Sequence, residues 1–274
     1  MSINNKIEIF GLTDVGLVRD HNEDSIGENR DLGLAVLADG MGGHRGGEVA
    51  SAITVSTILE SLADELKNIK PGDIDEETGF SLESIAVNNA VIKANDNVFT
   101  SSNENSRYRG MGTTVVVLLF HNNHFTVAHV GDSRLYRYRD GELEQITRDH
   151  SLMQELVDKG FYTTEQARES LNKNLVTRAI GAEESVQVDV HEDAAHPGDI
   201  FLLCSDGVTD MLEDDEIRNT IADNSEDLEK IATELIRLSN ESGGKDNISA
   251  ILAKPLDAFP TEDSLFSRVF ELFS

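Results

Sequence analysis

Two spacings of apolar residues organise the chain, one typical of strands and the other typical of helices. Residues 33–38 and 200–204 are nearly continuous apolar runs, which predict buried strands. Residues 48–69 instead repeat apolar side chains at helical spacing, so we expect a helix with one buried stripe. That stripe contains Val49, Ile53, Ile58, Leu62 and Leu66.

Shorter patterns predict the other elements. Further strands are expected at 7–10, 113–120, 125–130, 134–138, 142–146, 186–191 and 247–253, and further helices at 82–100, 214–222 and 227–239. Asn122-Asn123 and Asp140-Gly141 each separate two strands and predict hairpin turns. His121 and His124 flank the first turn, where we expect them to be exposed.

The pattern indicates a single large domain, because the chain contains no internal repeat, low-complexity tract or linker. We expect this domain at residues 1–257, since sandwiches of this size often stay undivided. Residues 258–274 form an amphipathic tail with apolar residues at helical spacing. Docking of this tail on its own domain is the favoured interpretation, and a helix that binds a partner or a membrane surface is the alternative.

Four aspartates lie at strand ends or in glycine-flanked turns: Asp24, Asp39, Asp206 and Asp246. Asp39 and Asp206 each end an apolar run, where a desolvated carboxylate needs a cation or hydrogen bonds. Oxygen ligands suit Mg²⁺ and Mn²⁺ better than zinc or copper. Asp-Gly is also a common turn pair in so acidic a chain, so spacing alone leaves a metal site and ordinary turns equally open.

Charge and composition exclude several classes of protein. Asp and Glu number 51 against 23 Lys and Arg, and the net charge of −28 argues against nucleic acid or an anionic membrane as a partner. No apolar run is long enough to span a bilayer, and the first residues lack the apolar core of a signal peptide. We therefore expect a cytoplasmic protein, and we expect it to be a monomer.

Two other chemistries fit the sequence poorly. The single Cys204 is expected to pack in the core, and a cysteine phosphatase would need arginine six positions later, where this chain has Asp210. The glycine-rich stretch 40–47 could cradle a nucleotide phosphate at a helix start. However, the third glycine of a dinucleotide fingerprint would fall on Arg45, and no Walker lysine phrase exists.

Six phrases, spread from Thr13 to Ala253, decide between these interpretations. They resemble, in order, the metal-dependent serine/threonine protein phosphatases of type 2C (the PPM family) in their short bacterial form. The phrases are TDVGLVRDHNED (13–24), ADGMGG (38–43), RGMGTT (109–114), HVGDSR (129–134), SDG (205–207) and GKDNIS (244–249). Any one of them could occur by chance, but six in the family's order are a strong signal.

The resemblance implies a fold and a reaction. The fold is α+β, with a central β-sandwich of two mainly antiparallel sheets, helices on both outer faces (α-β-β-α), and a helical flap at about 150–180 beside the active cleft. The reaction is hydrolysis of phosphoserine and phosphothreonine on proteins at a dinuclear Mn²⁺ or Mg²⁺ site, with a weaker third ion. The partners it implies are phosphoprotein substrates and a bacterial Ser/Thr kinase that the enzyme opposes.

The same resemblance assigns ligands to the metal pair. Asp39 would bridge the two ions, and the carbonyl of Gly40 would add a ligand to one of them. Asp206 and Asp246 would hold the other ion. This arrangement agrees with the chemistry of two-metal sites, which activate a bridging water and neutralise the phosphate.

Further positions complete the implied site. Glu23 and Asp24 would act largely through metal-bound waters, and Asp132 would contact a third ion together with Asp206. Arg19 would hold the substrate phosphate, because its planar guanidinium offers paired donors. The alternatives are a turn aspartate that caps its own backbone for Asp132 and a solvated surface arginine for Arg19.

One position departs from the eukaryotic members of the family. These carry histidine directly after the Asp-Gly pair, proposed as the acid that protonates the leaving group, whereas this chain has Met41. His44 is one candidate for the acid, and a metal-bound water is another. Two further functions stay open: a catalytically dead regulator, which would lack ligand carboxylates, and a phosphatase of a stress-response switch, whose members usually lack the Arg19 phrase.

Overall fold

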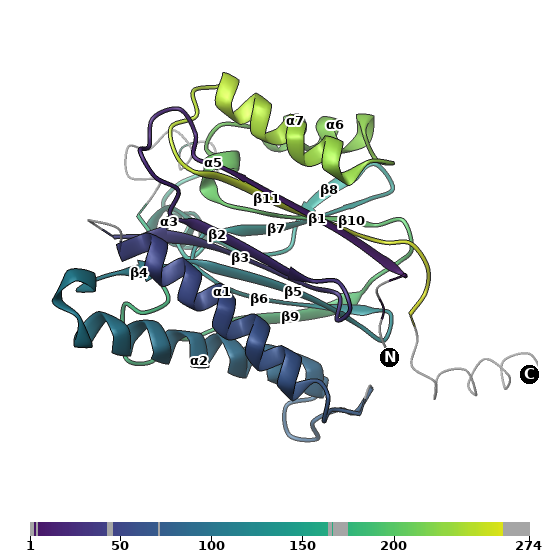
Figure 1. Ribbon diagram of the computed structural model, residues 1–274. Coiled ribbons are helices and arrows are strands. Elements are labelled where there is room, and N and C mark those ends of the chain that lie inside the picture. Colours follow the sequence, from purple (N-terminus) through teal and green to yellow (C-terminus); the bar gives the residue numbers. More distant parts are fainter. Residues whose placement is uncertain are drawn as a thin grey trace, which may run out of the picture.

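Two antiparallel β-sheets pack face to face at the centre of the protein, and helices cover both outer faces (Figure 1). This computed structural model describes residues 3, 5–42, 46–70, 72–163, 166 and 175–259. The α-β-β-α arrangement expected from the sequence is confirmed.

The two sheets bring together strands from distant parts of the chain. One has the order β1-β11-β10-β7-β8, and the other has the order β2-β3-β5-β6-β9, with a short β4 paired to β3. The first consists of β1 (Ile7–Asp14), β7 (Arg134–Arg139), β8 (Glu142–Gln145), β10 (Ile200–Cys204) and β11 (Ile248–Pro255). The second consists of β2 (Asp24–Asn29), β3 (Leu34–Met41), β4 (Gly112–Thr113), β5 (Val115–His121), β6 (His124–Val130) and β9 (Asp189–Ala194).

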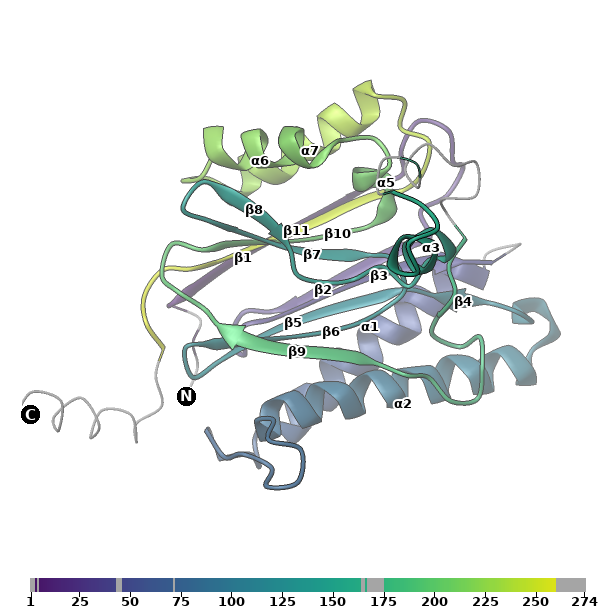
Figure 2. The ribbon, with the colours of Figure 1, turned by 180° about the vertical axis from the view of Figure 1, so that it is seen from behind.

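Long helices cover each sheet on its outer side (Figure 2). The sheet of β2 to β9 is covered by α1 (Gly46–Glu65) and α2 (Leu82–Glu104), and the other sheet by α6 (Asp214–Asp223) and α7 (Leu228–Glu241). Shorter helices in the described part of the chain are η1 (Ser106–Tyr108), α3 (Leu152–Asp158) and α5 (Asp206–Thr209). In both views α3 and α5 lie at the same end of the sandwich as β4.

The continuous apolar runs are explained by burial on both faces of a strand. In β3, Leu34 and Val36 pack against α1 and α2, whereas Ala35 and Leu37 pack against the opposite sheet. The strand β10 alternates in the same way between the helices α6 and α7 and the inter-sheet layer. Because successive side chains point to opposite faces, a strand between two apolar layers needs no polar positions.

The layer between the sheets changes in character from one end to the other. At one end, four aromatic rings form its centre: Phe120, Phe125, Phe201 and Phe259. The ring of Phe201 lies 5.3 Å from that of Phe120 and 4.8 Å from that of Phe125, centre to centre. At the other end, polar residues replace the apolar ones, and this is where the predicted site residues lie.

Most of the predicted elements are observed, but the structure differs from the predictions at a strand, a strand boundary and a histidine pair. The strand β2 was not predicted, because its sequence DSIGEN is mostly polar. The strand β9 begins at Asp189 rather than at 186. His121 is buried and His124 is half-buried, whereas both were expected to be exposed; Nε2 of His121 lies 2.7 Å from the hydroxyl of Thr126 in the neighbouring strand β6. The turn residues Asn122 and Asn123 do have positive φ angles, as the predicted hairpin requires.

Part of the predicted architecture lies outside the described residues. This applies to residues 260–274 of the tail, to 164–165 and 167–174 of the flap, and to His44. Within the described part of the chain, no helix is long and apolar enough to cross a membrane.

The aromatic layer predicts a large loss of stability on truncation. Phe201→Ala removes a fully buried ring, so we expect the free energy of unfolding to fall by about 3–5 kcal/mol in chemical denaturation. The control is Phe80→Ala, which truncates a ring that is 37% exposed. Similar losses in the two variants would contradict this description of the core.

Candidate active site

The strand pairing of β2 with β3 places two predicted ligands side by side. Asp24 and Asp39 are direct partners in this antiparallel register. In β3, Asp39 continues the series of Ala35 and Leu37, whose side chains point between the sheets. The carboxylate of Asp39 is therefore directed to the inter-sheet layer, where it replaces an apolar side chain.

The other aspartates reach the same place from the opposite sheet and from a turn. Asp206 is the first residue of α5, two residues after β10 ends, and Asp246 lies two residues before β11. Asp132 lies in the turn between β6 and β7. We call this part of the sandwich the acidic end and define it by the following residues: Asp24, Asp39, Asp132, Asp206 and Asp246.

Electrostatic effects within the acidic end are strong. The pKa of Asp39 is raised well above its ordinary value, first by burial and then by the charges of Asp24, Asp206, Asp132 and Asp246. Burial is also the largest cause of the raised pKa of Asp206, followed by the charge of Asp132. Like charges that are held together in this way favour protonation or a bound cation.

The surroundings of Asp24 show that protein groups satisfy the site only in part. Its Oδ2 accepts a hydrogen bond from the hydroxyl of Ser249 at 2.6 Å, but its Oδ1 is buried and has no hydrogen-bond partner. Burial raises the pKa of Asp24 to about 6, although hydrogen bonds from Ser249 and Ser205 lower it. An unpartnered carboxylate oxygen among like charges fits a site for a hard divalent cation.

The acidic end is too wide for one ion bound by protein alone. No three of its carboxylates bring oxygens within 4.8 Å of one another, since the one described group that does so lies elsewhere. Mg²⁺ normally keeps several waters and takes only one or two carboxylates. The spacing therefore fits ions whose coordination is completed by water.

Two glycines allow α1 to approach β3 closely beside Asp39. A Cβ atom on Gly40 would lie 2.3 Å from the carbonyl oxygen of Gly47 and 2.5 Å from that of Glu23. The backbone nitrogen of Gly40 donates to that carbonyl of Glu23 at 3.2 Å. The structure therefore places Glu23 and Gly40 next to Asp39, and burial raises the pKa of Glu23.

Asn247 holds the loop that carries Arg19, and the sequence analysis gave it no role. Its Nδ2 donates to the carbonyl oxygens of Val15 and His21 at 3.0 and 2.9 Å, and its Oδ1 accepts from the backbone nitrogen of Glu23 at 2.8 Å. Asn247 is buried and follows Asp246 directly. The phrase GKDNIS contains it, but only the fold reveals its partners.

Arg19 lies at the edge of the acidic end. Its Nη2 donates to Oδ2 of Asp246 at 2.5 Å, and its side chain is 52% exposed. The hydrogen bond to Asp246 is the largest cause of its raised pKa. The guanidinium is thus tethered beside the carboxylates yet accessible to a ligand from solvent.

The described residues assign no side chain as the general acid. Met41 ends β3 and cannot donate a proton, and His44 lies outside the described residues. Cys204 is buried in the core, as predicted, and burial raises the pKa of its thiol to about 12. This thiol is therefore no nucleophile at neutral pH.

A second group of possible ligands was not predicted. Ring nitrogens of His129 and His150 and a carboxylate oxygen of Asp189 lie within 4.8 Å of one another. However, Nη1 of Arg178 donates to Oδ1 of Asp189 at 2.7 Å and lies 3.0 Å from Nε2 of His150. The guanidinium of Arg178 thus already supplies the positive charge that a metal ion would bring to this group.

The fold and the acidic end define a class of metal-dependent hydrolases, and comparisons with known proteins identify its family. The family model described as protein phosphatase 2C matches residues 18–253. Protein phosphatase PhpP of Streptococcus pneumoniae is 36% identical over 249 residues, which cover 90% of this chain and 96% of that protein. The chain therefore belongs to the protein phosphatase 2C family and is a metal-dependent protein-serine/threonine phosphatase.

Solved structures agree with this assignment. The serine/threonine phosphatase PstP/Ppp of Mycobacterium tuberculosis has a TM-score of 0.80 at 35% identity, covering 91% of this chain and 98% of that one. The catalytic domain of PstP in complex with two manganese ions has a TM-score of 0.79 at 34% identity, covering 92% and 99% of the two chains.

Repulsion within the acidic end predicts an unusual effect of one substitution. In metal-stripped protein, Asp39→Asn removes a charge from the cluster, so we expect it to raise the free energy of unfolding by about 1 kcal/mol or more. In saturating Mn²⁺ the order should reverse, because the wild type gains more from the ion. Urea unfolding with and without chelator measures both values.

The control for this comparison is Asp64→Asn, which changes an exposed carboxylate far from the site. It should change stability little in either condition. Loss of stability in metal-stripped Asp39→Asn would show that the repulsion has been overestimated.

Proposed function

We propose that the protein hydrolyses phosphoserine and phosphothreonine on proteins at a dinuclear Mn²⁺ or Mg²⁺ site built from the acidic end. The observation that carries this proposal is the set of carboxylates at the acidic end, gathered from both sheets and only partly satisfied by protein hydrogen bonds. When bound, two such ions supply positive charge for the phosphate and an activated water. PstP in complex with two manganese ions supports the ion count.

Each ligand has a proposed role that follows from its place. Asp39, on which the charges of the other four carboxylates act, would hold both ions, and the carbonyl of Gly40 beside it would be a further ligand. Asp206 and Asp246, which lie next to β10 and β11 of the opposite sheet, would hold the second ion. Glu23 and Asp24 would act through waters, which agrees with the unpartnered Oδ1 of Asp24.

Arg19 and Asp132 serve the substrate and a weaker third ion. Arg19 is accessible and close to Asp246, so its guanidinium could donate hydrogen bonds to the oxygens of a substrate phosphate beside the acidic end. Asp132 is the proposed ligand of the third ion together with Asp206, and the charge of Asp132 raises the pKa of Asp206. Burial, followed by the charge of Asp149, raises the pKa of Asp132 itself to about 6, which a hydrogen bond from its own backbone only partly offsets.

A Ser/Thr kinase with the opposite activity is the proposed partner, and its phosphoprotein targets are the proposed substrates. A catalytically dead scaffold is the second candidate function. The complete carboxylate set argues against it, because a scaffold has no need to hold repelling charges together.

Metal removal tests the chemistry directly. Protein stripped with a chelator should not hydrolyse a phosphothreonine peptide, and Mn²⁺ or Mg²⁺ should restore the activity, because the carboxylates alone cannot neutralise a phosphate. Phosphate release is the measurement. Full activity after rigorous removal of metal, or no activity with either ion, would contradict the proposal.

Substitution of Arg19 tests phosphate binding. Arg19→Ala should raise KM for the phosphopeptide by about 10-fold or more with a smaller loss in kcat, because the guanidinium binds phosphate in the ground state as well as the transition state. Arg30→Ala is the matched control, since Arg30 is as exposed and is paired with Glu28 instead. An unchanged KM in Arg19→Ala would leave Arg19 as a surface arginine.

A further inference from the structure

One residue of the flap holds the Asp132 turn at two points. The backbone nitrogen of His150 donates to the carbonyl oxygen of Gly131 at 2.9 Å, and the backbone nitrogen of Gly131 donates to Nδ1 of His150 at 3.1 Å. Gly131 has a φ of +108°, and a Cβ atom there would lie 2.6 Å from the side chain of Thr114. His150 therefore fixes both backbone polar groups of the residue before Asp132.

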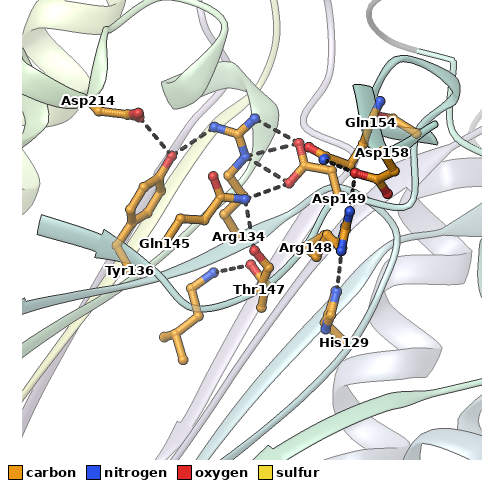
Figure 3. Close-up of polar contacts among 12 residues, drawn as sticks. His129, Arg134, Tyr136, Gln145, Thr147, Arg148, Asp149, Gln154, Asp158 and Asp214 are labelled. Carbon is orange, nitrogen blue, oxygen red and sulfur yellow. Dashed lines mark hydrogen bonds and ion pairs between the residues drawn. The ribbon is translucent and has the colours of Figure 1, made fainter. Parts of the chain in front are cut away.

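The neighbour of His150 holds the other side of the same turn. Asp149 accepts hydrogen bonds from Nε and Nη2 of Arg134 at 2.7–3.1 Å, as Figure 3 shows. Arg134 lies two residues after Asp132. Two consecutive residues at the start of the flap thus hold the turn on both sides of the proposed ligand.

Hydrogen bonds on the far side of the turn lead to the bridging ligand. The hydroxyl of Ser133 contacts that of Thr114 at 2.6 Å, and the hydroxyl of Thr114 accepts from the backbone nitrogen of Asp39 at 3.1 Å. The turn that carries Asp132 is therefore fixed between Asp39 and the flap.

The contacts of the His150 ring define which of its nitrogens carries the proton. A backbone N–H can only donate, so Nδ1 accepts from Gly131 and the proton of a neutral ring is on Nε2, which lies 3.2 Å from Oδ2 of Asp189. Nη1 of Arg178 also lies 3.0 Å from Nε2, but both are then donors, so its hydrogen bond is the one to Oδ1 of Asp189 and not one to the ring. Burial, followed by the neighbouring His129, lowers the pKa of His150 to about 4, so the ring is neutral at neutral pH. Metal binding at Nε2 would need the proton on Nδ1, where it would face the N–H of Gly131.

The other end of the flap closes on the same residue. The backbone nitrogen of Thr177 donates to the carbonyl oxygen of His150 at 2.8 Å, and Arg178 contacts both the ring of His150 and Asp189. A change in the position of either end of the flap would therefore act on His150, and through it on Gly131.

We propose that His150 is a positioning residue for the third ion: through both backbone polar groups of Gly131 it holds the turn that carries Asp132. This inference rests on the proposed role of Asp132. It assigns the group of His129, His150 and Asp189 to holding this turn rather than to a metal site.

The test uses variants that differ in one acceptor. His150→Ala removes the acceptor for the N–H of Gly131, whereas in His150→Asn the amide oxygen can take the place of Nδ1. His121→Ala is the matched control, because it removes another buried histidine, one in the β5–β6 hairpin. Asp132→Ala provides the reference for loss of the third ion.

Two measurements besides activity are made on each full-length variant. Amide hydrogen exchange of Gly131 in metal-stripped protein reports the hydrogen bond itself, and calorimetric titration reports the number and affinity of bound Mn²⁺ ions. The Mn²⁺ concentration for half-maximal kcat on a phosphopeptide is then compared with these affinities.

In His150→Ala we expect faster exchange at Gly131, an affinity for the weakest Mn²⁺ ion lower by about 10- to 100-fold, and a tight pair that is unchanged. His150→Asn should restore both, and His121→Ala should alter neither. The half-maximal Mn²⁺ concentration should rise in parallel with the loss of affinity.

Three results would overturn the inference: unchanged affinity for the weakest ion in His150→Ala, equal weakening of all ions, or no difference between the Ala and Asn variants. The failure of the proposed function is separate, since it would appear as wild-type protein that is inactive with Mn²⁺.

Discussion

Burial of several carboxylates together at the acidic end, which adds desolvation to mutual repulsion, is the constraint on which the rest of the structure depends. Buried like charges disfavour the folded state, so other interactions must hold them in place. The β2–β3 ladder aligns Asp24 with Asp39, the hydroxyl of Ser249 binds Asp24, and Thr114 binds the backbone of Asp39. Three apolar layers stabilise the fold and offset this local cost. The offset matters because the free energy of unfolding of a domain is only about 5–15 kcal/mol in total.

The partners of the other acidic residues separate structural carboxylates from those of the site. Asp149, Asp189 and Asp199 are each paired with an arginine on a neighbouring segment. Among the residues that the structure describes, Asp246 alone of the acidic end has such a pair, with the half-exposed Arg19. Acidic residues outnumber basic ones more than twofold in this chain, so many carboxylates must lack an arginine partner. An unpaired carboxylate therefore indicates a site only where it is also buried.

The sequence predicted those parts of the fold that depend on local pattern. Runs that are apolar at every position revealed β3 and β10, because strands between two apolar layers carry no polar side chain. It did not reveal β2, whose polar sequence reflects its place at the edge of a sheet, beside the acidic end. Within the site, the motifs identified the carboxylates, and the register of β2 and β3 explains how two of them meet.

The supporting residues could not be predicted in the same way. Asn247 and His150 act through backbone groups of segments that are distant in the sequence, such as Val15 and Gly131, and no spacing encodes those contacts. The buried His121 shows the same limit, because its burial depends on neighbouring strands and not on the turn it flanks.

The order of β11 in the chain has a consequence for the synthesis of the enzyme. This strand lies between β1 and β10, and it and the residues before it carry Asp246, Asn247 and Ser249. A growing chain therefore lacks part of its site, and the partner strand of β1, until almost the whole domain has left the ribosome. Pairings between such distant segments form slowly. A chain that ends before this strand therefore lacks part of the candidate site and has no phosphatase activity to exert on phosphoproteins.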